Sequence, residues 1–92
     1  MIKSFKHRGL KRLFERDDRR GIRPDLLDDV EDILGRLDQA AMPQALNLPG
    51  YRLHPLTGRW RGFWSVTVRA NWRIIFRFEK EDAFDVELID YH

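Results

Sequence analysis

The chain has 92 residues, of which 42% are hydrophobic and 12% aromatic, and these values favour one globular domain spanning residues 1–92. It contains no cysteine, which excludes disulfides, thiolate metal sites and cysteine nucleophiles and is compatible with a reducing compartment. No apolar run approaches the roughly 20 residues of a membrane-spanning helix, and the N-terminus lacks a signal-peptide pattern. We therefore expect a cytoplasmic protein without membrane contact.

Charge is strongly segregated along the chain, although the formal net charge is only +2. Residues 1–23 hold nine Lys/Arg and three Asp/Glu, and residues 24–41 hold one against six. Residues 42–77 then hold six arginines and no acid, and residues 78–92 hold one lysine and six acids. A long basic stretch attracts polyanions such as nucleic acid. Charge alone leaves open a solvated basic face that acidic neighbours balance.

Two helices are predicted in the N-terminal half, after a short first strand at residues 2–5. The first helix is basic and covers about residues 6–16, with one apolar stripe of Leu10, Leu13 and Phe14. After a polar loop that ends near Pro24, a second helix begins, with Asp25 predicted to cap its first turn. This helix ends near Ala41 and carries an apolar stripe formed by Leu26, Val30, Ile33 and Leu37.

The last third of the chain predicts an antiparallel sheet. Residues 42–61 lack sustained periodicity and are predicted to be a loop that contains His54. Alternating patterns then predict three strands, at residues 62–68, 72–78 and 84–88. One sheet face would pack on the helices, and the other would form a polar floor with Ser65, Thr67, Arg73 and Arg77. The predicted fold is α+β, with two N-terminal helices packed on a small antiparallel β-sheet.

The chain ends with a carboxylate, a phenol and an imidazole, supplied by Asp90, Tyr91 and His92. Together with His54, these groups could provide a base, an acid and an orienting carboxylate for metal-free cleavage of RNA. Taken singly, His54 is more often a surface or capping residue, and Tyr91 a packing aromatic. A metal site of His54, Asp90 and His92 is the weaker alternative, because such sites need further supporting groups. We expect no metal and no cofactor.

Aromatic residues alternate with arginines between residues 59 and 73. This alternation suits stacking on bases beside contacts to phosphates. Trp64 and Trp72 lie on the predicted core face, so Trp60 is the better candidate for stacking.

Several segments together resemble the HigB-type toxins of the RelE/ParE superfamily. They are Met1 to Lys6, Leu53 to Gly58, Trp64 to Ile74 and the Asp90–Tyr91–His92 tail. The resemblance implies a RelE-like microbial RNase fold and a ribosome-dependent mRNA endoribonuclease that cuts codons in the ribosomal A site. It also implies a HigA-type helix-turn-helix antitoxin as partner, and repression of operator DNA through the toxin–antitoxin pair.

Carried over by position, the resemblance assigns a catalytic set of His54, Asp90, Tyr91 and His92. Arg73 matches a basic residue of the same cleft, where it would hold the scissile phosphate. Thr57 is a departure, since many relatives have lysine in this loop. Arg59 and Arg61 are the cations that could replace it, and Trp60 would add a stacking surface.

Two rival functions remain open at this point. Some members of the superfamily poison DNA gyrase and cleave no RNA, and fold alone does not fix function. A non-catalytic RNA- or ribosome-binding module is the second rival. Neither rival needs His54 or the Asp90–Tyr91–His92 tail. Substitution of these residues would therefore distinguish an RNA-cleaving toxin from both rivals.

Overall fold

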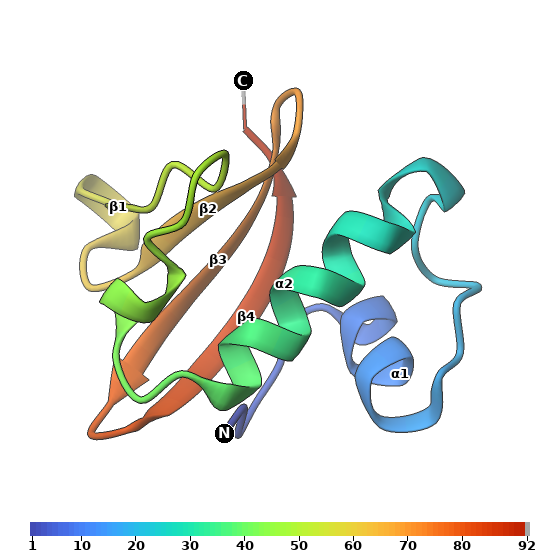
Figure 1. Cartoon of the computed structure of the whole chain (residues 1–92), viewed down its shortest axis with the longest axis horizontal. Coiled ribbons are helices and arrows are strands. Elements are labelled where there is room, and N and C mark those ends of the chain that lie inside the picture. The colour runs from blue at the N-terminus through green and yellow to red at the C-terminus, as the bar shows by residue number, and fades with distance from the viewer. Residues whose placement is uncertain (92) are drawn as a thin grey trace.

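The computed structural model describes residues 1–91, so His92 lies outside the described residues (Figure 1). Helices α1 and α2 lie against one face of a single antiparallel sheet with strand order β1-β2-β3-β4. This arrangement confirms the predicted α+β class. Within residues 1–91, no helix is long and apolar enough to span a membrane. The elements are α1 (Arg8–Arg16), η1 (Pro24–Leu26), α2 (Leu27–Gln39), η2 (Pro43–Leu46), β1 (His54–Pro55), η3 (Gly58–Trp60), β2 (Trp64–Arg69), β3 (Trp72–Glu79) and β4 (Asp82–Asp90).

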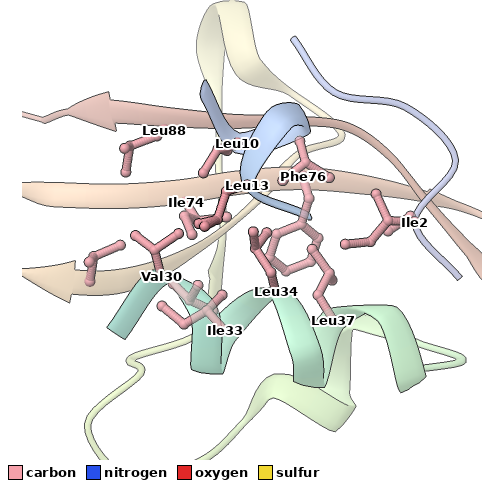
Figure 2. Close-up of a cluster of buried hydrophobic side chains, with 14 of the residues drawn as sticks. Ile2, Leu10, Leu13, Val30, Ile33, Leu34, Leu37, Ile74, Phe76 and Leu88 are labelled. Atoms are coloured by element: carbon pink, nitrogen blue, oxygen red, sulfur yellow. The ribbon is translucent and has the colours of Figure 1, made fainter. Parts of the chain in front are cut away.

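The hydrophobic core lies between the helices and the helix-covered face of the sheet (Figure 2). Alternate residues of β2 and β3 point into it, as the period-two patterns predicted. In β4 the prediction is wrong at Phe84, because the β3–β4 register shifts and Ala83 takes the core position instead. Trp64 and Trp72 pack at its edge and are partly buried. The helices contribute their predicted apolar stripes, and the most deeply buried members of the core include Leu10, Val30, Leu37, Leu46, Val66, Ile74, Phe76 and Val86.

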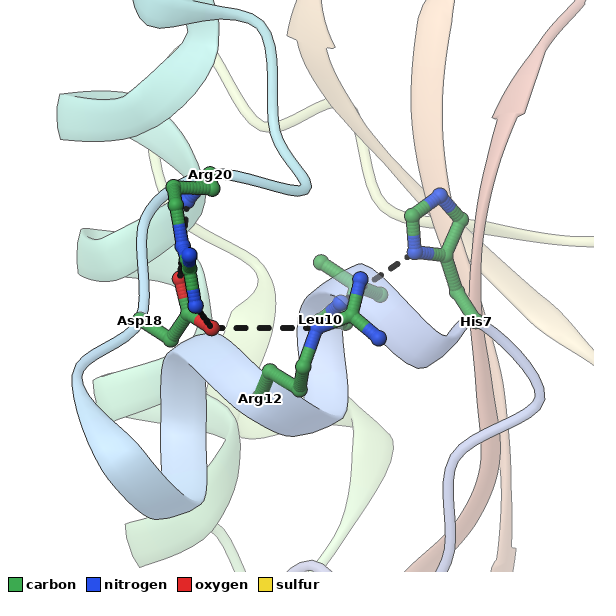
Figure 3. Close-up of polar contacts among 5 residues, drawn as sticks. All are labelled: His7, Leu10, Arg12, Asp18 and Arg20. Carbon is green, nitrogen blue, oxygen red and sulfur yellow. Dashed lines mark hydrogen bonds and ion pairs between the residues drawn. The ribbon is translucent and has the colours of Figure 1, made fainter.

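Helix α1 begins two residues later than predicted because His7 caps it. The His7 Nδ1 accepts the backbone N–H of Leu10 at 3.1 Å (Figure 3). Just beyond the helix, the Asp18 carboxylate accepts hydrogen bonds from the Arg20 guanidinium at 3.0 Å. These hydrogen bonds lower the pKa of Asp18 to about 2. The Arg12 guanidinium of α1 lies 3.9 Å from the same Asp18 carboxylate, so side chains hold both ends of this basic helix.

Two predictions about the N-terminal half are wrong in detail. Asp25 does not cap α2, because its carboxylate instead accepts two hydrogen bonds from the neighbouring Arg23 guanidinium, at 2.9 and 3.1 Å. The segment at residues 2–5 forms no strand of the sheet; it runs parallel to β4 through isolated bridges of Ile2 with Ala83 and Phe5 with Val86.

The second face of the sheet, opposite the helices, also differs from its prediction. His54 belongs to strand β1 rather than to a loop, and it pairs with Ser65. Ser65 and Ile75 are buried, and so is Leu56, which follows β1. The reason is that the chain after β1 turns back on β2, where the Leu56 N–H donates to the Phe63 carbonyl at 2.8 Å. The polar floor is thus partly covered.

Arg77, the fourth predicted member of the polar floor, forms two ion pairs. Its guanidinium lies 2.7 Å from the Asp85 carboxylate and also contacts Glu79. Hydrogen bonds to these two acids raise the Arg77 pKa. Arg77 therefore stabilises the β3–β4 hairpin.

Candidate functional site

One cross-strand row on the second face leads from His54 toward the strand that carries the tail. His54 pairs with Ser65 on β2, Ser65 with Ile75 on β3, and Ile75 with Glu87 on β4. Directly paired residues of an antiparallel sheet share a face. His54 is exposed at the β1 end of this row, so its imidazole is open to a ligand.

The imidazole of His54 is held in one tautomer. Its Nδ1 lies 3.0 Å from the Arg52 carbonyl oxygen. A carbonyl oxygen only accepts hydrogen bonds, so in the neutral imidazole Nδ1 carries the proton and Nε2 keeps a lone pair. Arg52 itself has φ 52°, in the left-handed region that non-glycine residues rarely adopt. Strained backbone of this kind is concentrated at functional sites.

Tyr51 anchors the segment that precedes His54. Its hydroxyl donates a short hydrogen bond to the Asp32 carboxylate on α2. Its backbone carbonyl accepts the Thr67 N–H of β2 at 2.7 Å. Burial and then the Asp32 contact raise the Tyr51 pKa, and the Tyr51 hydrogen bond lowers the Asp32 pKa. Helix α2 and strand β2 together fix the backbone that orients His54.

The tail is held at the end of the sheet nearest the β2–β3 turn (Figure 1). Asp90 is paired with Trp72, and the Tyr91 N–H donates to the Asn71 carbonyl at 2.7 Å. The Arg23 guanidinium lies 5.6 Å from the Trp72 ring centre. Asp90 and Tyr91 are both exposed. His92, the fourth predicted catalytic residue, lies outside the described residues.

The η3 turn brings the loop after β1 into contact with the tail. The ring centres of Trp60 and Tyr91 are 6.0 Å apart, with their planes tilted by 40°. The Arg59 guanidinium lies 4.5 Å from the Trp60 ring centre. Thr57 precedes the turn, and its backbone carbonyl accepts the Trp60 N–H at 3.4 Å. The exposed Arg61 follows the turn. The predicted substrate contacts of this loop thus surround one aromatic pair.

Arg73 has a structural contact that the sequence did not suggest. Its Nη1 donates to the carbonyls of Ala70, at 2.6 Å, and Trp72, at 3.1 Å. Arg73 therefore braces the β2–β3 turn, whose Asn71 holds the tail. Its predicted contact with the scissile phosphate stays a prediction.

Lys6 is a cation of the second face that the sequence prediction missed. Its backbone N–H donates to the Val86 carbonyl at 2.9 Å, and its Nζ lies 5.7 Å from the Phe63 ring centre. The sequence placed Lys6 on the solvent side of the first helix. No local pattern reveals this contact, because it joins the N-terminal segment to the start of β2.

Comparisons with known proteins identify the family. A family model described as the RelE-like toxin of the type II toxin-antitoxin system HigB matches residues 3–92. The chain belongs to the HigB-like toxin family. A curated relative of this HigB-like toxin, endoribonuclease HigB of Proteus vulgaris, is 49% identical over 92 residues that cover 100% of both chains. The predicted family is confirmed, and a type II toxin implies an antitoxin partner.

Solved structures confirm the RelE-like fold of this HigB-like toxin. YafQ from E. coli strain BL21(DE3) superposes with a TM-score of 0.62 at 17% identity, covering 95% of this chain and 87% of its own. A YoeB/ParE toxin from Agrobacterium tumefaciens gives a TM-score of 0.53 at 17% identity, covering 100% and 99%. At these identities the likeness establishes the fold and not the target.

Proposed function

We propose that this HigB-like toxin is a ribosome-dependent endoribonuclease that cleaves mRNA in the ribosomal A site by metal-free acid/base catalysis. Its endoribonuclease class is supported by the full-length identity of 49% to endoribonuclease HigB. An exposed His54 on β1 and an exposed, anchored tail after β4 of the same sheet support the chemistry. Cleavage of the codon in the A site would halt translation.

The reaction that these groups suit is attack by the RNA on its own backbone. A base removes the proton of the 2′-hydroxyl, and the 2′-oxygen forms a bond to the adjacent phosphorus. The bond from phosphorus to the 5′-oxygen breaks, and an acid protonates that leaving oxygen. The products are a 2′,3′-cyclic phosphate and a free 5′-hydroxyl. DNA lacks the nucleophile and is spared.

The contact of the His54 Nδ1 with the Arg52 carbonyl is the single observation that supports the assignment of roles. Because Nδ1 donates to the Arg52 carbonyl, the lone pair of Nε2 is available to act as the base. His92 would then be the acid. Asp90 would orient one imidazole or stabilise its protonated form. Tyr91 would donate a hydrogen bond to the substrate or stack on it. These four residues form the proposed catalytic set.

Basic and aromatic residues beside this set would hold the RNA. Arg73 would contact the scissile phosphate, with Arg59 and Arg61 as further phosphate contacts. Thr57 would contribute a hydroxyl hydrogen bond to the phosphate. The lysine that many relatives have in this loop would bind the phosphate more strongly. Trp60 would stack on a base. Developing negative charge on the phosphate is stabilised when such cations are already in place.

Ribosome docking would use the basic outer side of α1. Four basic residues and Glu15 line a shallow hollow there: Arg8, Lys11, Arg12 and Arg16. Such a surface binds ribosomal RNA through phosphates, and its contribution weakens as salt rises. We further propose a HigA-type helix-turn-helix antitoxin as partner, operator DNA bound through that complex, and a cytoplasmic location for this single domain.

The test uses purified toxin, programmed ribosomes and mapping of mRNA 5′ ends. Wild type should cut within the A-site codon, whereas His92→Ala and a chain truncated before Asp90 should not. Phe14→Ala, an exposed aromatic on α1, serves as the surface control and should cut normally. A gyrase supercoiling assay runs in parallel. Inhibition of gyrase without RNA cleavage would refute the proposal, and so would full cleavage by both tail variants.

A further inference from the structure

A partly exposed pair of aromatic rings joins η3 to the tail, outside the hydrophobic core cluster. Trp60 is half-buried, and Tyr91 is 44% exposed. Neither ring belongs to the core cluster that stabilises the sheet. We propose that Trp60 and Tyr91 form a clamp for one nucleobase of the RNA. The clamp has this role only if the toxin is the endoribonuclease proposed here.

The separation of the two rings suits a clamp that is nearly closed. Their centres are 6.0 Å apart, and their planes are tilted by 40°, so the rings form a wedge rather than a stack. A base between two aromatic rings needs a separation of about 7 Å, which is two van der Waals contacts. An opening of about 1 Å, together with a rotation that brings the two planes close to parallel, therefore admits a base that contacts both rings.

The η3 turn is built to allow such a small opening. Gly58 and Gly62 lie on either side of Trp60 with φ of 66° and 94°, values that glycine adopts without strain. Between them the turn is closed on itself, since the Arg61 N–H donates to the Gly58 carbonyl at 3.1 Å. Small rotations at the two glycines would move the Trp60 ring as a unit, as short hinges do.

Arg59 adds charge to the clamp. Its guanidinium lies 4.5 Å from the Trp60 ring centre and is exposed. This position steadies the indole by a cation–π contact and places a cation beside the clamped nucleotide, where its phosphate lies. The ligand with matching chemistry has a flat π-surface and an adjacent negative charge, which describes a nucleotide within an RNA strand.

Clamping by stacking predicts a graded preference rather than a strict code. Stacking tolerates every base, because each base presents a π-face. Larger ring systems gain more contact area, so a purine at the clamped position should bind about threefold better than a pyrimidine. No hydrogen-bond readout is required. Trp60 thus acts as a specificity residue, whereas the Tyr91 hydroxyl can act in catalysis.

The first experiment measures base binding by the intact toxin without catalysis. A 2′-O-methyl RNA trinucleotide, which cannot undergo the cleavage reaction, is added while the indole N–H signals of the three tryptophans are followed by NMR. The Trp60 signal, assigned with Trp60→Phe, should shift, and the signals of Trp64 and Trp72 should not. The clamp is refuted if the Trp60 signal stays in place at millimolar trinucleotide, or if all three signals move alike.

The second experiment measures cleavage on programmed ribosomes. Trp60→Ala should raise KM about tenfold with kcat within twofold, and Trp60→Phe should restore most of the affinity. Tyr91→Phe keeps the ring and should leave KM near wild type. The matched control is Phe14→Ala, which removes an exposed ring that lies 5.6 Å from the ring of the partly buried Phe5. An unchanged KM in Trp60→Ala contradicts the clamp, whereas a wild-type toxin that binds the trinucleotide but cleaves nothing contradicts the enzyme assignment alone.

Discussion

On the helix-covered face of the sheet, Ile74 and Phe76 are fully buried against α1 and α2. On the second face, Ile75 lies between them in sequence and belongs to the row that leads to His54. The first face is held by many apolar contacts. The second carries isolated polar contacts, such as His54 with Arg52 and Arg77 with Asp85. We therefore expect substitutions on the first face to lower mainly stability and substitutions on the second face to lower mainly activity.

The largest expected effect is on the helix-covered face. Phe76→Ala removes a fully buried ring from the core and leaves a cavity that the surrounding sheet cannot close. It should lower the free energy of unfolding by about 3–5 kcal/mol. Urea denaturation followed by circular dichroism measures the change. A loss below about 1 kcal/mol would mean that the core does not depend on this face as described.

The next effect is on catalysis with the fold intact. His54→Ala should lower the rate of mRNA cleavage on ribosomes by about 100-fold or more, because it removes the proposed base. The free energy of unfolding should stay within about 0.5 kcal/mol of wild type, since the imidazole is exposed. Both quantities are measured on one preparation. Near-normal cleavage would show that His54 is not the base. Loss of folding would show that His54 contributes to stability as well as to chemistry.

A smaller effect should have opposite signs for stability and activity. Arg52 has φ 52°, so Arg52→Gly relieves the strain and should change the free energy of unfolding by about 1 kcal/mol or less, in the stabilising direction. The carbonyl that holds the His54 Nδ1 becomes less well fixed, and the cleavage rate should fall several-fold. Thermal unfolding and ribosome cleavage are the two readouts. Destabilisation by the glycine would show that the left-handed backbone is not strained.

The smallest effect concerns pH and the helix-covered side. Burial lowers the pKa of His7 from its usual 6.5; Glu87 on β4 opposes this change and Arg12 on α1 adds to it. A lowered pKa means that the unfolded chain takes up the proton first as pH falls. The contribution of His7 to stability is therefore complete above about pH 6.5 and is lost below it. Protonated Nδ1 can no longer accept the Leu10 N–H, which costs about 1 kcal/mol of helix capping.

His7→Asn is the matched control for this pH dependence, because asparagine caps helices and does not titrate. Unfolding free energies of wild type and His7→Asn are compared at about pH 7.5 and about pH 5.5. Wild type should lose more stability than the variant on acidification. Equal losses in the two chains would show that other groups control the response to acid.

The elements of the helix-covered face could be predicted from the sequence because they depend on periodic patterns. The stripe through Val30 and Leu37 and the alternation through Ile74 and Phe76 are local signals, and each proved to be buried. The cap of α2 was mispredicted because Asp25 had a competing partner two residues away, Arg23. The sequence identifies candidate hydrogen-bond partners for a side chain such as Asp25, but the folded backbone determines which partner it contacts.

The second face was harder to predict because its contacts join distant segments. His54 and the tail were recognisable from residue types, and Trp60 was recognised as a stacking candidate. The burial of Ser65, the contact of Lys6 with Phe63 and the left-handed backbone of Arg52 have no local signature. These features arise from how the loop after β1 folds over the sheet. Such information is absent from any short window of sequence.

We propose that His54 and the tail promote attack by the 2′-hydroxyl of RNA on its own phosphate. The most direct measurement replaces the single nucleotide at the mapped cleavage position of a ribosome-bound mRNA by its 2′-deoxy form. We expect cleavage at this position to be lost, while an all-ribose mRNA in the same reaction is cut and carries a 2′,3′-cyclic phosphate before any later hydrolysis. Continued cleavage at the deoxy position would contradict it.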